Sequence, residues 1–180
     1  MTEQNRSQSR SVYVLDTSAF VAGFDPFALG DLQVTVPLVE EEIQRNSMIK
    51  TRFYVAVESG KIKIKQPRDI SENLAKASAG KVGDSFKLSK VDMQLLSLAL
   101  ELKAEGYTPQ IVSDDYSIQN VAVKLGIKFT SLSTFGIKKL IEWVIYCPAC
   151  YKQYAADCNF KKCQICGTEL KRKPKRQNKI

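Results

Sequence analysis

The chain has 180 residues, of which 44% are apolar, with 27 lysines and arginines, 19 aspartates and glutamates, five cysteines and no histidine. This length suits one domain with a small appended module. The absence of histidine excludes Ser-His-Asp and Cys-His nucleophile systems, HExxH zinc hydrolases and nucleases that use imidazole as an acid or base. Catalysis must therefore use carboxylates, hydroxyls, lysines or a bound metal.

The positive charge is concentrated at the C-terminal end. Residues 146–180 carry nine lysines and arginines against two acidic residues, whereas the remaining 145 residues carry 18 against 17. A basic segment of this kind is typical of a surface that binds a phosphate backbone or an anionic membrane, although it also serves solubility alone. No run reaches the roughly 20 apolar residues of a membrane span. Because no secretory signal is visible either, we expect a cytoplasmic location, no membrane partner and reduced cysteines.

The body of the chain alternates short apolar strands with helices. Residues 1–10 are predicted to be disordered. Strands are predicted at 11–15, 32–36, 62–64, 110–113 and 128–130, and helices at 17–24, from Pro37 through Glu42, 48–59, from Ser71 to about 79, 89–105, 116–125 and 133–142. A loop around 80–85 interrupts this order. The pattern predicts a three-layer α/β domain with a mostly parallel central sheet over 11–142, followed by a cysteine module over 143–170 and a basic tail over 171–180.

Four of the five cysteines form two CxxC pairs, Cys147-Pro-Ala-Cys150 and Cys163-Gln-Ile-Cys166, joined by twelve residues. Four thiolates in this spacing predict a zinc ribbon with a closed, structural Zn²⁺ site. Two disulfides or a redox-active CxxC are the alternatives, and a reducing compartment and the duplicated motif disfavour them. Cys158 lies between the pairs and is predicted not to bind the metal.

Tyrosines and a phenylalanine alternate with lysines in the module, which therefore offers both charge and stacking surfaces to RNA. The bound zinc and its four thiolates would leave the module with a formal charge of about +5 by the arithmetic of the residue charges. The predicted RNA-binding residues are Lys152, Lys161, Lys162, Lys171, Arg172 and Lys173.

Acidic residues follow two of the predicted strands, Asp16 after the first and Asp114-Asp115 after a later one. In an open parallel sheet the carboxyl ends of the strands share one crevice, so these side chains are expected to meet there. Carboxylates brought together repel each other unless a cation lies between them, and Mg²⁺ or Mn²⁺ prefers oxygen ligands. Thr17 and Ser113, next to these acids, could orient them by hydrogen bonds.

Each acid also has a simpler interpretation in the capping of helices. Asp16 could cap the short helix that follows it, and Asp114 or Asp115 could cap the helix starting at Tyr116. Ser89 and Asp92 have the spacing of a capping box. Residues 40–42 could simply favour the positive end of their own helix. Taken singly, these residues therefore do not decide between a structural and a catalytic role.

Taken together, the motifs resemble PIN-domain ribonucleases. They are Leu15-Asp16-Thr17-Ser18, Val39-Glu40-Glu41-Glu42-Ile43, Leu88-Ser89-Lys90-Val91-Asp92 and Val112-Ser113-Asp114-Asp115-Tyr116. Gly83-Asp84, the run from Asp115 to Val121 and the four-cysteine ribbon are similar to one branch, the Nin-one-binding family of rRNA-maturation endonucleases. The resemblance covers Val12 to Cys166, and the compact length is similar to the archaeal form.

The resemblance implies catalytic acids at Asp16, Glu42, Asp92 and Asp115 that hold Mg²⁺ or Mn²⁺. Glu42 matches the family pattern better than Glu40 or Glu41, and Asp84 and Asp114 are possible additional groups. The implied activity is metal-dependent cleavage of precursor rRNA at the 3′ end of the small-subunit rRNA. The implied partners are the pre-ribosomal particle and a KH-domain assembly factor. The alternatives are a toxin-type PIN ribonuclease acting on tRNA or mRNA, and a non-catalytic rRNA-binding adaptor.

Overall fold

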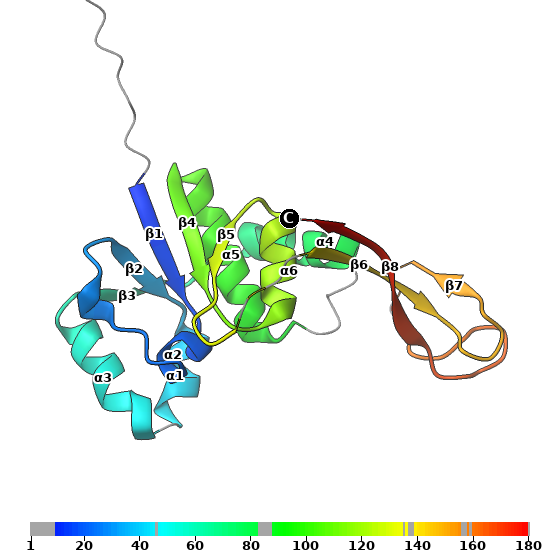
Figure 1. The fold of residues 1–180 in the computed structure, drawn as a ribbon, viewed down its shortest axis with the longest axis horizontal. Helices are drawn as coiled ribbons and strands as arrows, with labels where there is room; N and C mark the ends of the chain where they lie inside the picture. The colour runs from blue at the N-terminus through cyan, green and yellow to red at the C-terminus, as the bar shows by residue number, and fades with distance from the viewer. Residues whose placement is uncertain are drawn as a thin grey trace, which may run out of the picture.

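A computed structural model describes residues 10–45, 47–82, 88–134, 136, 139–155, 158 and 160–179. Its larger part is built on a five-stranded sheet of order β3-β2-β1-β4-β5, in which every neighbouring pair is parallel (Figure 1). Consecutive residues such as Val14 and Leu15 are both fully buried, which requires cover on both faces of the sheet. The strands are β1 (Arg10–Leu15), β2 (Leu32–Thr35), β3 (Ile62–Ile64), β4 (Tyr107–Val112) and β5 (Lys128–Thr130).

Helices connect and cover these strands, so the predicted α/β class with a mostly parallel sheet is confirmed. The longest, α5, begins at a capping box formed by Ser89 and Asp92 and buries a leucine-rich face in the core. The helices are α1 (Thr17–Val21), α2 (Pro37–Gln44), α3 (Ser47–Glu58), α4 (Asp69–Val82), α5 (Lys90–Ala104) and α6 (Tyr116–Lys124), with a 3₁₀ turn, η1, at Pro26–Ala28.

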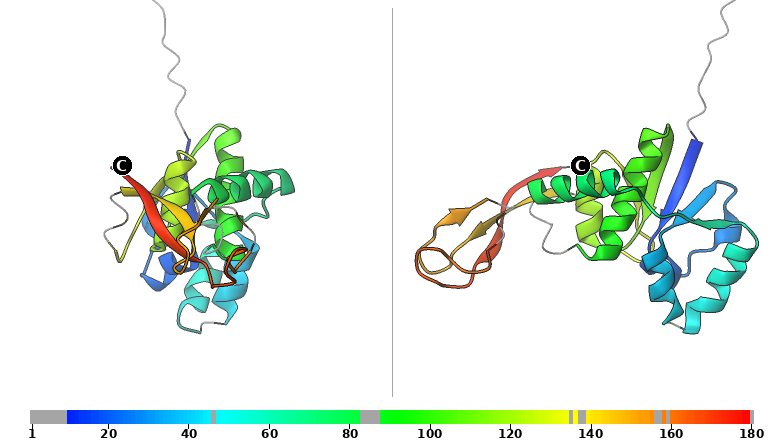
Figure 2. Two further views of the ribbon diagram at one scale, coloured as in Figure 1. Left: turned by 90° about the vertical axis from the view of Figure 1, so that its right-hand side faces the viewer. Right: turned by 180° about the vertical axis from the view of Figure 1, so that it is seen from behind.

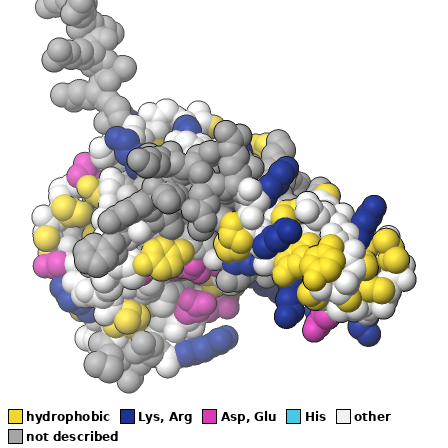
Figure 3. All heavy atoms as spheres, turned by 45° about the vertical axis from the view of Figure 1, so that its right-hand side comes forward, with side chains coloured by type: hydrophobic (Ala, Val, Ile, Leu, Met, Phe, Trp, Pro, Cys, Tyr) yellow, Lys and Arg dark blue, Asp and Glu magenta, His cyan; other side chains and the backbone are white. Residues whose placement is uncertain are grey.

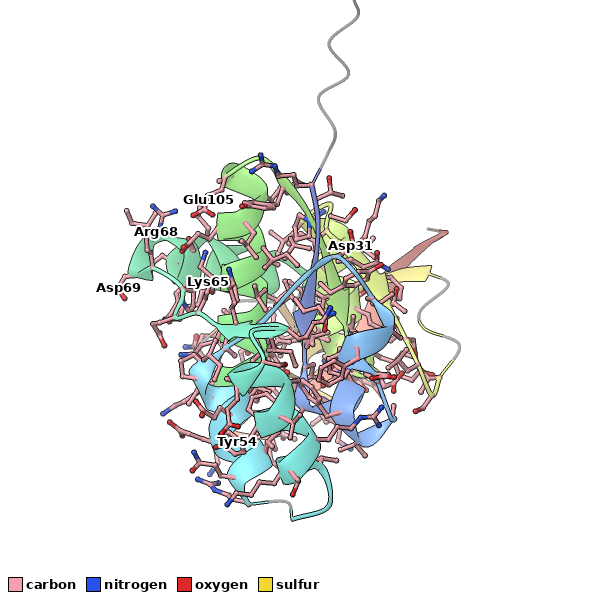
Figure 4. The ribbon with its side chains drawn as sticks, turned by 90° about the vertical axis from the view of Figure 1, so that its left-hand side faces the viewer. Asp31, Tyr54, Lys65, Arg68, Asp69 and Glu105 are labelled. Atoms are coloured by element: carbon pink, nitrogen blue, oxygen red, sulfur yellow. The ribbon has the colours of Figure 1, made fainter. Side chains whose placement is uncertain are left out.

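Charged residues fasten the start of α4 to the end of α5 (Figure 4). The Arg68 guanidinium lies 3.2 Å from Glu101 and 3.7 Å from Glu105, and the Arg68 backbone N–H donates to Glu101 at 2.9 Å. Burial acts to raise the pKa of Glu101, but these hydrogen bonds and the Arg68 charge outweigh it and lower the pKa. The ionised Glu101 therefore holds α4 in place on α5.

The C-terminal residues form a second, antiparallel sheet of order β7-β6-β8, made of β6 (Lys139–Tyr146), β7 (Gln153–Tyr154) and β8 (Lys171–Lys179). β6 and β8 pair along their whole length, from Lys139 opposite Lys179 to Tyr146 opposite Lys171. The pair leaves the α/β body beside α4 and α6 and carries β7 at its far end (Figures 1 and 2). We call residues 139–179 the ribbon.

The strands of this region differ from the elements predicted there. The helix predicted over 133–142 is wrong, because residues 139–142 belong to strand β6. The segment predicted as a basic tail is strand β8, the partner of β6. The predicted domain end at 142 lies inside β6, at a bulge between Glu142 and Trp143. Of the predicted disordered residues 1–10, the first nine lie outside the described residues, and Arg10 is the first residue of β1.

Candidate active site and metal centre

Asp16 lies at the carboxyl end of β1, beside the end of β4. Its backbone N–H donates to the carbonyl of Val112 at 3.1 Å, which continues the pairing of the two strands. The carboxylate is buried and accepts hydrogen bonds from the Ser18 hydroxyl at 2.6 Å and the Ser113 hydroxyl at 2.8 Å. It also accepts the Thr17 backbone N–H at 2.7 Å. These contacts fix the Asp16 carboxylate at the edge of the sheet.

Asp92 comes from a third element, the first turn of α5, and its side chain is only 8% exposed. The pKa of Asp92 is raised to about 6, chiefly by burial; hydrogen bonds from Ser89 partly oppose this rise, and the negative charges of Asp115 and Asp16 add to it. The Asp92 carboxylate therefore lies within electrostatic reach of both other acids. The structure brings together Asp16, Asp92 and Asp115 from three separate parts of the chain.

Glu42 reaches this site through Thr17. The Thr17 hydroxyl donates to the Glu42 carboxylate at 2.5 Å, and the backbone N–H of the same threonine binds Asp16. Among the described residues, the carboxylates of Glu40 and Glu41 make no hydrogen bond or ion pair. Of the three consecutive glutamates, Glu42 is thus the one connected to Asp16.

The capping interpretations also hold for these acids. Asp16 is the N-cap of α1, Asp92 and Ser89 form the capping box of α5, and Asp115 caps α6 by accepting the Ser117 N–H at 2.6 Å. A cap fixes a carboxylate against the backbone, so it also places that carboxylate reproducibly. The structural and catalytic roles are therefore compatible at these positions.

Asp114 has a different environment from Asp115. Its carboxylate accepts the backbone N–H groups of Leu132 at 2.9 Å and Ser133 at 3.1 Å, and also the Ser131 hydroxyl. Burial acts to raise the pKa of Asp114, but these hydrogen bonds outweigh it and lower the pKa. The Asp114 side chain thus anchors the loop after β5 and is not directed at the other acids.

Ser18 contacts the acids of the site, although it was not predicted as a site residue. Its hydroxyl donates to Asp16 and accepts the Asp114 N–H at 3.1 Å. Its place in the Asp16-Thr17-Ser18 motif was the signal that could have indicated it. Asp84, a predicted additional site residue, lies outside the described residues.

The chemistry of the donor set fits a divalent cation. Carboxylate oxygens are the ligands that Mg²⁺ and Mn²⁺ prefer. The mutual repulsion that contributes to the raised pKa of Asp92 is the repulsion that a bound cation would relieve. Asp16, Asp92 and Asp115, with Glu42 linked to Asp16 through Thr17, are therefore a donor set of the chemical type that such an ion prefers.

The four predicted zinc ligands also converge. The sulfur atoms of Cys147, Cys150, Cys163 and Cys166 all lie within 4.8 Å of one another. Cys147 and Cys166 are 3.4 Å apart, and Cys150 and Cys163 are 3.5 Å apart, far longer than a disulfide of about 2.05 Å. Tetrahedral zinc with Zn–S bonds of about 2.3 Å separates its sulfurs by about 3.8 Å, so the cluster can bind Zn²⁺.

Comparison with known proteins places the chain in a family. Residues 13–102 match the family model described as the PIN domain of ribonuclease. Endoribonuclease Nob1 of Methanothermobacter thermautotrophicus is 36% identical over 89% of this chain and 91% of its own. Endoribonuclease Nob1 of Pyrococcus abyssi is 38% identical over 91% of this chain and 94% of its own. The chain belongs to the Nob1 endoribonuclease family.

Membership confirms the predicted resemblance and the predicted endoribonuclease activity. A ribonuclease of the VapC type is related as well: VapC1 of Thermoplasma acidophilum is 35% identical over 89% of this chain and 77% of its own. Within the described residues, none of the helices combines the length and the apolar character needed to cross a bilayer.

In this Nob1-family ribbon the two CxxC turns have matching geometry. The residue after each second cysteine adopts a left-handed conformation, Tyr151 with φ 60° and Gly167 with φ 72°. The N–H of Tyr151 donates to the Cys147 carbonyl at 3.0 Å, and the N–H of Gly167 to the Cys163 carbonyl at 2.9 Å. Each turn therefore reverses the chain over a pair of sulfurs, and Gly167 does so without the steric cost that Tyr151 carries.

The six predicted RNA-binding residues all lie on the ribbon. Five have exposed side chains, and Arg172 is half-buried. The Arg172 guanidinium lies 4.0 Å above the Trp143 ring and the Lys173 ammonium 4.8 Å above the Tyr146 ring, so β6 rings hold both cations in place. Figure 3 shows lysines and arginines around hydrophobic side chains on the projecting ribbon.

Proposed function

We propose that this endoribonuclease cleaves precursor rRNA at the 3′ end of the small-subunit rRNA. The observation that carries the catalytic part is the convergence of Asp16, Asp92 and Asp115 at the carboxyl ends of β1 and β4 and the start of α5. The substrate rests on membership of the Nob1 family and on the basic ribbon next to a nearly neutral body.

Asp16, Glu42, Asp92 and Asp115 are proposed to hold one or two Mg²⁺ or Mn²⁺ ions. When bound, such ions polarise the scissile phosphate, lower the pKa of a coordinated water and stabilise the charge on the leaving oxygen. Ser18 and Ser113 orient Asp16, and Thr17 orients Glu42, through the hydrogen bonds already described. Neutral protonated Asp92 binds a cation poorly, so cation binding and the pKa of Asp92 are coupled.

The ribbon is proposed to bind the RNA backbone. Zn²⁺ bound by Cys147, Cys150, Cys163 and Cys166 would be structural, because no ligand position is left open. Family resemblance also supports the pre-ribosomal particle and a KH-domain assembly factor as partners, and a cytoplasmic location. The phosphate contacts are assigned to Lys152, Lys161, Lys162, Lys171, Arg172 and Lys173.

A toxin-type ribonuclease that cuts tRNA or mRNA is the second candidate, and the VapC1 relative of similar coverage favours keeping it. A cleavage assay separates the two. We expect cutting at the small-subunit 3′ boundary in Mn²⁺, no cutting after chelation, and weaker cutting of tRNA or mRNA at equal concentration. Zinc content measured after chelation must be unchanged, so that loss of activity reports the carboxylate site. Preferred cutting of tRNA or mRNA would support the toxin-type activity instead.

Asp16→Asn tests the metal-binding role directly. The variant should lose cleavage by a factor of about 10³ or more, because a neutral amide is a poor ligand for Mg²⁺ or Mn²⁺. RNA affinity should change less than about twofold, because the ribbon supplies the phosphate contacts. Asp25→Asn is the matched control, since Asp25 caps η1 outside the site, and it should cleave normally. Equal loss of binding and cleavage in Asp16→Asn would argue against the proposed division of roles.

A further inference from the structure

The ribbon contains a pocket of about 280 Å³ that lies away from the carboxylate site. Its apolar lining residues are Ile145 on β6, Phe160 in the loop between the cysteine pairs, and Leu170 just before β8. The volume is near the lower end of the range of about 300–1,000 Å³ for ligand pockets, which suits a single planar ring system. We call it the ribbon pocket.

Backbone pairing holds the three sides of the ribbon pocket together. The Leu170 N–H donates to the Lys161 carbonyl at 2.9 Å, and Ile145 lies opposite Arg172 in the β6–β8 register. Phe160 packs edge-on against Tyr154 with the ring centroids 5.2 Å apart. The apolar lining is therefore held by the fold of the ribbon and does not depend on a single flexible side chain.

The lining of the ribbon pocket also carries both signs of charge. Lys161, Lys171 and Arg172 line it together with Glu169. Arg172 is positioned by its stacking on Trp143. Within the described residues the Glu169 carboxylate makes no hydrogen bond or ion pair, so its two oxygens can accept from a ligand.

We propose that the ribbon pocket binds one guanine nucleotide of single-stranded RNA. The guanine ring would pack on Ile145, Phe160 and Leu170, and the basic side chains of the lining would bind its phosphates. Glu169 would accept the N1–H and the N2 amino group of guanine. This inference rests on the proposed RNA-binding function of the ribbon and extends it from backbone contact to base recognition.

Guanine is favoured over the other bases by its hydrogen-bond donors. A carboxylate only accepts hydrogen bonds, and its two oxygens match two parallel donors. On the Watson–Crick edge guanine presents two adjacent donors, N1–H and the N2 amino group, whereas adenine, cytosine and uracil each present one donor among acceptors. An acceptor opposite Glu169 would be repelled. The charge of Glu169 therefore selects for guanine while the surrounding cations retain the backbone.

The test measures binding of fluorescent octauridylates that carry one variable base at the centre, with the full-length chain and no added divalent ion. We expect the guanine oligonucleotide to bind about tenfold or more tightly than the adenine, cytosine or all-uracil ones, as for one bidentate contact. Inosine lacks the N2 amino group and should bind with intermediate affinity. A 7-deazaguanine keeps the Watson–Crick edge and should bind like guanine.

Glu169→Gln should bring the guanine oligonucleotide to the affinity of the adenine one. Glu58→Gln, the same change at an exposed position on α3, should leave the preference intact. Zinc content equal to wild type in both variants shows that the ribbon is folded. Affinities within twofold for all bases, or a guanine preference that survives Glu169→Gln, would overturn the proposal that the ribbon pocket binds guanine. Cleavage in Mn²⁺ without any guanine preference would leave the nuclease proposal standing, so the two can fail separately.

Discussion

At the residue scale, Asp92 combines a structural and an electrostatic role. Its carboxylate accepts the Ser89 N–H at 2.7 Å and so closes the capping box of α5, yet it is buried beside the charges of Asp16 and Asp115. The folded protein binds the Asp92 proton more tightly than the unfolded chain does, because the pKa rises from 3.8 to about 6. Ionised Asp92 therefore opposes folding above about pH 6, and this penalty disappears as the pH falls to 4.

Asp92→Asn should consequently stabilise the fold at pH 7 without divalent ions. An amide oxygen can still accept the Ser89 N–H, while the buried charge is gone, so we expect a gain of roughly 1–2 kcal/mol in the free energy of unfolding. Urea denaturation in a chelator at pH 7 and pH 4 measures it, and the gain should vanish at pH 4. Glu101→Gln is an opposite control, since the lowered pKa of Glu101 means that its charge stabilises the fold at pH 7. A destabilised Asp92→Asn at pH 7 would contradict the electrostatic interpretation.

The three consecutive glutamates of α2 provide a second test at the same scale. Glu42→Gln should reduce cleavage by about 10²-fold or more, because it weakens a charged ligand that Thr17 orients. Glu41→Gln makes the same chemical change at the neighbouring exposed position and should retain wild-type cleavage. Rates measured on the same RNA in Mn²⁺ compare them. If Glu41→Gln were the more damaged variant, the assignment of Glu42 would be wrong.

The sequence could indicate which acids lie near strand ends, but not all of their contacts. Asp16 and Asp115 follow strands that a parallel sheet aligns, so their proximity was predictable. The partners of Asp114 were not, since the loop 131–134 reaches it only through the pairing of β4 with β5. The same limit applies to Ser18, whose contact with the Asp114 N–H joins residues 96 positions apart.

At the element scale, the segment leading into the ribbon is a strand where a helix was predicted. Residues 139–146 contain Ile141, Trp143, Val144, Ile145 and Tyr146, which favour a strand, but a strand needs a partner. That partner is β8, about 30 residues further along, in a segment whose lysines and arginines indicated an exposed tail. Local composition does not reveal such a long-range pairing, whereas the capping box and leucines of α5 specified that helix locally.

The two CxxC turns yield a prediction about the same element. Tyr151→Gly should relieve a left-handed conformation that costs a non-glycine residue about 1 kcal/mol, and should slow zinc loss to a chelator. Gly167→Ala should accelerate zinc loss: an added Cβ meets no atom within 4 Å, so the cost is purely conformational. Metal release followed with a zinc-sensitive dye measures both. Similar rates for the two variants would show that backbone conformation does not limit zinc retention.

At the scale of the whole molecule, the excess positive charge and the proposed catalytic carboxylates lie in different parts of the chain. The acids lie on the α/β body, whereas the predicted phosphate-binding residues lie on the ribbon, as the charge count along the chain had indicated. Phosphate contacts release counterions, so the affinity for single-stranded RNA should fall with salt by about 0.7 log units per log unit of salt for each contact. The salt dependence therefore measures how much of the affinity the ribbon supplies.

Replacing Lys161, Lys162, Lys171 and Lys173 by glutamine should reduce the slope of log affinity against log salt concentration, the salt slope, by about 2–3 if most of them contact phosphate. Binding measured at salt concentrations between about 50 and 300 mM gives this slope. Lys61, Lys63, Lys65 and Lys90 carry equal charge on the body, and the corresponding fourfold glutamine variant should keep most of the slope. A larger loss in the body variant would place the RNA contacts away from the ribbon.

The pairing of Lys139 with Lys179 has a practical consequence for engineering. The ribbon begins and ends at the same place beside α4 and α6. It can therefore be exchanged between relatives as one unit with a single junction to the α/β body. A fluorophore attached after β8 would report on that junction, while one at Ile165, which is exposed in the second CxxC turn, would report on the zinc-binding end of the ribbon. In such chimeras the ribbon of one relative would determine the RNA preference and the α/β body of another would determine the cleavage activity.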